Sequence, residues 1–154
     1  MEFVFISDKA VNWEDAIIKT SKALFDAGFV TGEFGSQCIK REREYPTGLG
    51  TQIPIAIPHT DSAFVHTSAI CVLALENQVP FINMEDSESE VPVEYVLNLA
   101  IKDGKNQIII LNKVLQVFNR EGLPEQLKRR GSGYLEEVIR QAFVNTPMAA
   151  KETD

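Results

Sequence analysis

A histidine stands where a predicted β-strand has to end. The run 53–61 reads Ile-Pro-Ile-Ala-Ile-Pro-His-Thr-Asp, and its alternate isoleucines are typical of a buried strand. Pro58 has no amide hydrogen with which to continue a strand ladder, so the strand is expected to stop there and to leave His59 at its end. Functional side chains often gather at strand ends in α/β proteins, and histidine changes protonation near neutral pH.

Phosphoryl transfer is the chemistry open to a histidine that acts without a catalytic partner. A neutral imidazole nitrogen attacks phosphorus, and a phosphoryl group bound to that nitrogen stays labile enough to be passed on. The site also needs an arginine or backbone amides against the phosphoryl oxygens, and a hydrogen bond that fixes the ring tautomer. Arg41 is the candidate cation. Residue types alone leave a second interpretation open, in which His59 is a hydrogen-bonded strand-end histidine and Arg41 an ordinary surface charge.

Other kinds of site find little support. Gly48-Leu49-Gly50 lacks the third glycine and the following lysine of a phosphate-cradling loop. His59 and His66 have no flanking cysteine pair, so they do not form a zinc-type ligand set, and no metal is expected. A nucleophile elbow of the serine hydrolases is also absent from the sequence.

Composition restricts the class of protein further. The chain has 154 residues, 44% of them hydrophobic, which is enough for the core of a single domain. A formal charge of −7 and a pI near 4.9 argue against a nucleic-acid partner and against an anionic membrane surface. No apolar run reaches the roughly 20 residues of a membrane helix, so no direct membrane insertion is expected. Cys38 and Cys71 are predicted to be buried and unreactive, and a cytoplasmic location fits best.

Periodicity predicts strands and helices that interleave along the chain, which favours an α/β architecture. The first helix, 13–27, has Asn12 as its cap and Gly28 as its stop. Segment 91–101 reads as partly strand but could be helical. The other predicted elements are strand 2–6, a helix from Thr31 to Glu44, strand 53–57, strand 67–75, helix 107–118, a short helix 124–130 and a last helix 132–143.

Two further expectations concern less regular parts of the sequence. Segment 76–92 is expected to be the least regular part of the chain, and its acidic run 85–90 is predicted to be a solvated loop rather than a calcium site. Helix 107–118 is expected to bury one face, formed by Ile108, Leu111, Leu115 and Phe118.

Three short motifs together resemble a known family. They are Arg41-Glu42, Pro46-Thr47-Gly48-Leu49-Gly50 and Ile55-Ala56-Ile57-Pro58-His59, and their combination is similar to the signature of the fructose/mannitol-type EIIA family of the bacterial phosphoenolpyruvate-dependent sugar phosphotransferase system. The resemblance extends from the first helix to Phe143. Within the family, the sequence is most similar to the galactitol-specific branch. The similar features are the long loop before the Ile-Ala-Ile strand, the Tyr-Pro-Thr-Gly sequence and His66.

The resemblance implies a phosphocarrier. His59 would accept a phosphoryl group from phosphorylated HPr, as tele-phosphohistidine, and pass it to a cysteine of the cognate EIIB, which works with EIIC in the membrane. Arg41 matches the arginine thought to steady the phosphohistidine. Further pocket candidates are Thr47, Thr60, Asp61, His66 and Gln107.

The family fold is a mixed sheet with helices on both faces, expected here over residues 1–145, with a flexible tail at 146–154. No cofactor is implied. Gln107 stands where the family usually has a second histidine, which puts a proton or orientation role there in doubt. The alternative function is an EIIA-like regulatory module whose histidine phosphorylation controls a protein partner.

Overall fold

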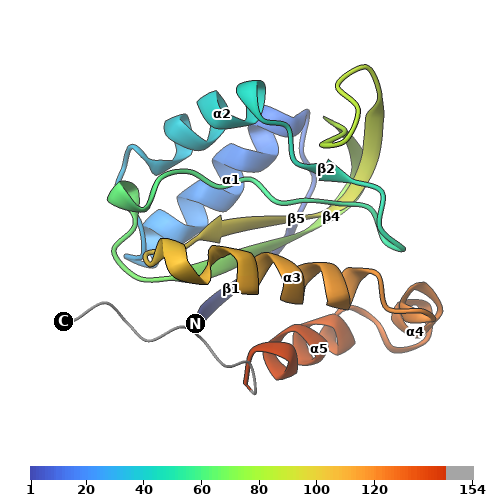
Figure 1. The fold of residues 1–154 in the computed structure, drawn as a ribbon. Coiled ribbons are helices and arrows are strands. Elements are labelled where there is room, and N and C mark those ends of the chain that lie inside the picture. Colours follow the sequence, from blue (N-terminus) through green and yellow to red (C-terminus); the bar gives the residue numbers. More distant parts are fainter. Residues whose placement is uncertain (145–154) are drawn as a thin grey trace.

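A five-stranded sheet of mixed direction forms the centre of the computed structural model, which describes residues 1–144 (Figure 1). Its spatial order is β1-β4-β5-β3-β2. Strands β1 and β4 are parallel, as are β3 and β5, whereas β4–β5 and β2–β3 are antiparallel. The strands are β1 (Glu2–Asp8), β2 (Gly48–Leu49), β3 (Ile55–Ala56), β4 (Ala69–Ile82) and β5 (Glu90–Ala100).

Helices cover both faces of this sheet, as the resemblance implied. Helices α1 and α2 lie on one face, and α3 and α5 lie on the other (Figure 1). The helices are α1 (Trp13–Asp26), α2 (Phe34–Glu44), α3 (Gln107–Phe118), α4 (Leu123–Arg130) and α5 (Ser132–Val144), with single 3₁₀ turns η1 (Ser62–Phe64) and η2 (Gly104–Asn106). The fold class is therefore confirmed. The tail predicted for 146–154 lies outside the described residues.

Local signals explain where α1 begins and ends. The Asn12 side chain accepts a hydrogen bond from the Asp15 amide, and acidic residues in the first turn complement the helix dipole. Gly28 follows the helix with a φ of 82°, a conformation that a residue with a Cβ rarely adopts.

Two apolar cores, one on each face, hold the helices to the sheet. In β4, Cys71 and Leu73 pack with α1 and α2, while Ile70 and Val72 pack with α3 and α5. The prediction of a strand covered on both faces is thus confirmed for this half of β4. Both cysteines are buried, as expected. Burial raises the pKa of the Cys71 thiol to about 12. Burial also raises the pKa of the Cys38 thiol, and the nearby charge of Glu42 adds to that effect.

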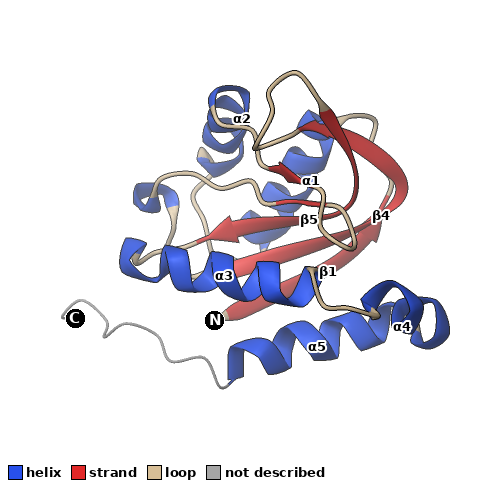
Figure 2. Ribbon diagram, turned by 45° about the vertical axis from the view of Figure 1, so that its right-hand side comes forward, coloured by secondary structure: helices blue, strands red, loops and turns tan. Residues whose placement is uncertain are grey.

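The prediction of an irregular segment 76–92 is wrong. Strand β4 continues to Ile82, and β5 begins at Glu90, so the two form one long hairpin with its turn in the acidic run (Figure 2). Val79 and Phe81 are buried and alternate with exposed neighbours, which is the period of a strand. A register shift between Ala74 and Val79 interrupts the ladder and hides this period from the sequence pattern. Segment 91–101, left open between strand and helix, lies almost wholly within β5.

Two smaller predictions also need correction. Helix α3 has the predicted bounds, but it buries Ile110, Val114, Val117 and Phe118, whereas Ile108 is 71% exposed. The predicted strand 53–57 is regular only at Ile55–Ala56.

Candidate active site

Two parallel strands and one helix start converge on a single pocket. Strands β3 and β5 point their carboxyl ends to the same edge of the sheet, where the Leu99 amide donates to the Pro58 carbonyl at 2.9 Å. Turn η2 leads into α3 beside that edge (Figure 1). The pocket has a volume of about 250 Å³ and is lined by Arg41, His59, Thr60, Asp61, Ser62, Leu99, Ile101, Gly104 and Gln107.

The His59 ring is held in one tautomer. Its Nδ1 lies 2.9 Å from the Ile57 carbonyl oxygen, and a carbonyl can only accept, so Nδ1 carries the hydrogen. In the neutral ring Nε2 then holds the free lone pair, and the Gln107 amide nitrogen lies 3.4 Å from it. Burial lowers the pKa of His59 below 6.5, the charge of Arg41 lowers it further, and the Ile57 bond raises it. The balance favours a neutral imidazole with Nε2 available.

Arg41 reaches the pocket from the last turn of α2. Its side chain is exposed, and the guanidinium lies 5.3 Å from the centre of the Tyr45 ring. Arg43, two residues on, instead pairs with Glu14 and lies over the Trp13 ring. Of these two arginines, Arg41 is therefore the one placed to meet an anion beside His59.

The polar residues after His59 form one rim of the pocket. Asp61 accepts a hydrogen bond from the Ala63 amide and so caps turn η1. Ser62, in the same turn, also lines the pocket and was not anticipated from the sequence, although it lies only three residues after the histidine. The lining residues Leu99 and Ile101 were missed too, because they continue an apolar run without any polar signal.

Two predicted pocket residues lie elsewhere. Thr47, in the loop between α2 and β2, is buried and makes hydrogen bonds with Glu42 and with the Ile57 amide. His66 is exposed beyond turn η1, and its backbone amide donates to the Phe29 carbonyl, which holds it outside the pocket lining. Glu42, for which the motif Arg41-Glu42 suggested no role, is 5% exposed, and burial raises the pKa of its carboxyl to about 7.

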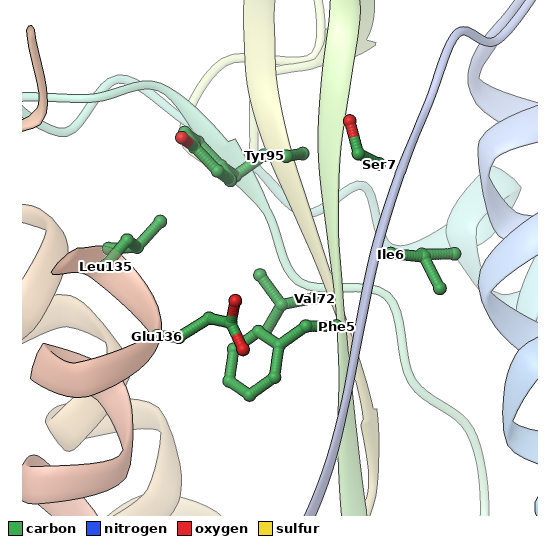
Figure 3. Close-up of a pocket in the computed structure, with 8 residues that line it drawn as sticks. Phe5, Ile6, Ser7, Val72, Tyr95, Leu135 and Glu136 are labelled. Carbon is green, nitrogen blue, oxygen red and sulfur yellow. The ribbon is translucent and has the colours of Figure 1, made fainter. Parts of the chain in front are cut away.

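A second hollow of about 130 Å³ lies between the sheet and α5 (Figure 3). Its polar lining residues are Ser7 from β1, Tyr95 from β5 and Glu136 from α5, and the rest of its lining is apolar, with Phe5, Val72 and Leu135 among it. Burial raises the pKa of the Tyr95 hydroxyl, and Glu94 adds to that effect.

The described residues show neither a metal site nor a membrane span. Within residues 1–144, no cluster of three or more histidine, cysteine or acidic side chains is arranged to hold a metal ion. Over the same range, no helix is both long and apolar enough to cross a bilayer.

The sequence matches a family model over almost its whole length. The model of the family "Phosphoenolpyruvate-dependent sugar phosphotransferase system, EIIA 2" covers residues 1–141. The chain belongs to this EIIA family. It is therefore an EIIA phosphotransferase component, as the three motifs indicated.

Individual EIIA proteins show the same relationship. The mannitol-specific phosphotransferase enzyme IIA component of Staphylococcus aureus is 31% identical over 143 residues, which cover 91% of this chain and 90% of that protein. The galactitol-specific EIIA component of Escherichia coli is 27% identical over 118 residues, which cover 76% of this chain and 78% of that protein.

A solved structure has the same fold. The mannitol enzyme IIA of Escherichia coli, determined in complex with phosphorylated enzyme IIB, aligns with a TM-score of 0.72 at 21% identity. The alignment covers 90% of this chain and 94% of that one. At this level of identity the likeness concerns the fold alone.

Proposed function

We propose that this EIIA component is a cytoplasmic phosphocarrier whose acceptor atom is Nε2 of His59. One observation carries the proposal: the Nδ1–H bond to the Ile57 carbonyl leaves Nε2 as the nucleophilic nitrogen, inside a pocket that Arg41 also lines. The family membership supplies the reaction class. The donor is phosphorylated HPr, and the acceptor is a cysteine of the cognate EIIB, which works with a membrane-bound EIIC.

Transfer to His59 exchanges one nitrogen–phosphorus bond for another. The lone pair of Nε2 attacks phosphorus in line with the donor nitrogen, which keeps the electron pair of the bond that breaks. The His59 ring gains positive charge as the new bond forms, and its Nδ1–H bond to the Ile57 carbonyl becomes stronger. Passing the group to a cysteine thiolate reverses these changes.

Positive charge and aligned dipoles at the pocket favour the phosphoryl oxygens. The Arg41 guanidinium can donate two parallel hydrogen bonds to them. Helix α3 starts at the pocket with Gln107, and the amides of a helix start attract an anion. The Gln107 side-chain amide, now beside Nε2, can turn its N–H toward a phosphoryl oxygen. In a chain with a charge of −7, these groups give the site its local attraction for phosphate.

The transported molecule is proposed to be a sugar alcohol of the galactitol type. The long loop before β3 and the Tyr-Pro-Thr-Gly wording support galactitol, and relatives named for galactitol and for mannitol both occur. Transfer rates from phosphorylated protein to a galactitol EIIB and to a mannitol EIIB would distinguish the two sugars. Efficient phosphorylation of His59 with no transfer to any EIIB would favour the regulatory module instead.

The deciding experiment is phosphorylation in vitro. The chain is incubated with phosphoenolpyruvate, enzyme I and HPr, and its intact mass is measured. Wild type and His66→Ala should each gain one acid-labile phosphoryl group, whereas His59→Ala should stay folded and gain none. Labelling that persists in folded His59→Ala would overturn the assignment of the acceptor.

A further inference from the structure

Glu42 is a buried acidic residue one position after the arginine of the site. It lies in the last turn of α2 and is 5% exposed, whereas Arg41 is exposed. Neighbouring residues of a helix point about 100° apart, because the helix has 3.6 residues per turn. Arg41 thus faces the pocket, while Glu42 faces the loop that leads to β3. Both side chains are held by the same turn of the helix.

The Glu42 carboxylate holds Thr47 at two points. The Thr47 amide donates to Oε2 at 2.7 Å, and the Thr47 hydroxyl donates to Oε1 at 2.9 Å. The same hydroxyl oxygen accepts the Ile57 amide hydrogen at 3.0 Å. The Thr47 hydroxyl has a single hydrogen, which it donates to Glu42, and its oxygen lone pair accepts the hydrogen of the Ile57 amide. Both bonds can therefore exist at the same time.

Ile57 connects this buried cluster to the acceptor histidine. Its amide is fixed by Thr47, and its carbonyl, on the other side of the same residue, accepts the Nδ1–H of His59. A continuous series of hydrogen bonds therefore runs from Glu42 through Thr47 and Ile57 to the imidazole. Pro58 follows with its own fixed φ, so few torsions remain free between Ile57 and the ring.

We propose that Glu42 is a positioning residue for phosphoryl transfer, which holds His59 in the Nδ1–H tautomer through Thr47 and Ile57. The inference rests on the proposed function of His59. Glu42 never touches the phosphoryl group. It fixes the direction of the Ile57 carbonyl, which decides which ring nitrogen carries the hydrogen and where Nε2 points. Because Arg41 is its neighbour on α2, the same contact also sets the distance between the arginine and the histidine.

A matched pair of threonine substitutions separates this role from general packing. Thr47→Ser keeps the hydroxyl, while Thr47→Val keeps the branched shape and removes the hydroxyl. Glu42→Gln removes one of the two acceptor oxygens. Glu44→Gln, at the exposed end of the same helix, is the control for a lost acidic group. Thermal unfolding of each protein reports whether it is folded.

Two measurements on each protein provide the test. Nitrogen NMR of the His59 ring, at a pH above its pKa, reports which nitrogen carries the hydrogen without any phosphorylation. The initial rate of phosphoryl uptake from phosphorylated HPr reports function. Wild type, Thr47→Ser and Glu44→Gln should show the Nδ1–H tautomer and similar rates. Thr47→Val and Glu42→Gln should show a larger Nε2–H fraction and an uptake rate lower by about 10-fold or more.

The outcomes decide the inference separately from the proposed function. An unchanged tautomer in folded Thr47→Val, or failure of Thr47→Ser to keep wild-type behaviour, would overturn the positioning role. If Glu42→Gln does not fold, the Thr47 pair still gives the answer. If wild type takes up no phosphoryl group, the proposed function fails, and the NMR comparison alone still shows whether Glu42 and Thr47 set the tautomer.

Discussion

Opposing influences from its surroundings set the pKa of His59. Burial and then the charge of Arg41 lower its pKa, while the bond to the Ile57 carbonyl raises it. An NMR titration should place the midpoint of His59 below 6.5, the ordinary value, and Arg41→Ala should move that midpoint upward. A wild-type midpoint at or above 6.5 would contradict this account.

Arg41 should matter more for transfer than the other arginine of its helix. Arg41→Ala should cost about 2–4 kcal/mol of transition-state stabilisation, and Arg41→Lys less, because an ammonium keeps the charge but lacks the fork that meets two oxygens. Arg43→Ala is the control, since Arg43 is bound to Glu14. Single-turnover uptake from phosphorylated HPr measures the difference. Equal rates for wild type and Arg41→Ala would remove Arg41 from the site.

His59, Arg41 and Glu42 all lie in the short motifs, but the sequence suggested a role only for the first two, because Glu42 also belongs to a charged run. Lys40 to Glu44 reads as a solvated surface. A signal was nevertheless present, because Phe34, Cys38 and Glu42 repeat every fourth residue and all three are buried. The hydrogen-bond partner of Glu42 comes from a loop whose path no local pattern specifies. A buried acid of this kind needs the tertiary structure to be recognised.

At the scale of elements, the spacing of apolar residues predicted the helices well but did not predict the outer half of the long hairpin. Pro80 faces Pro92 across β4 and β5, and two prolines opposite each other are unusual inside paired strands. The register shift nearby lets the ladder resume beyond the interruption. The sequence pattern of 76–82 therefore looked irregular although Val79 and Phe81 alternate toward the core.

The packing of β2 against this hairpin gives a test at the same scale. A Cβ on Gly48 would lie 2.7 Å from the Ile82 carbonyl oxygen, so Gly48→Ala must push β2 away from β4. We expect a loss of about 1–3 kcal/mol in the free energy of unfolding, typical of overpacking, together with slower phosphoryl uptake because Thr47 is the neighbouring residue.

Gly50→Ala is the matched control for Gly48→Ala. Its Cβ would meet nothing within 4 Å, so its stability should stay within about 0.5 kcal/mol of wild type. Urea unfolding of both proteins gives the comparison. Similar stability of the two variants would show that β2 can yield without cost.

Over the whole molecule, the buried Glu42 and the half-buried His59 make stability respond to pH in opposite directions. The pKa of Glu42 is raised from 4.5 to about 7, so its contribution is fully present below pH 4.5 and is lost as the pH rises to about 7. The lowered pKa of His59 contributes above pH 6.5 and is lost as the pH falls through the folded-state value. Where both groups titrate, the two slopes oppose each other, so stability should change little with pH over that range.

Glu42→Gln should remove one of these two contributions. Relative to wild type, its free energy of unfolding should rise by up to roughly 3 kcal/mol between pH 4.5 and pH 7. Cys38 and Arg41 are the ionisable neighbours of Glu42; the raised thiol pKa and the permanent charge of arginine keep both constant over this range. Urea titrations at several pH values measure the change. Parallel curves for the two proteins would show that Glu42 ionises as it does in the unfolded chain.

The strand order also has a consequence for the time course of folding. Two pairs of strands, β4–β5 and β2–β3, are joined by short connections, whereas β1 pairs Glu2 with Ala69 and β3 pairs Ile55 with Tyr95. Contacts between distant parts of the chain form slowly, because long loops must close first. We therefore expect the β4–β5 hairpin to form early and the pocket to form late. During synthesis, a chain whose α3 has not yet emerged from the ribosome would contain His59 but would lack a complete pocket around it.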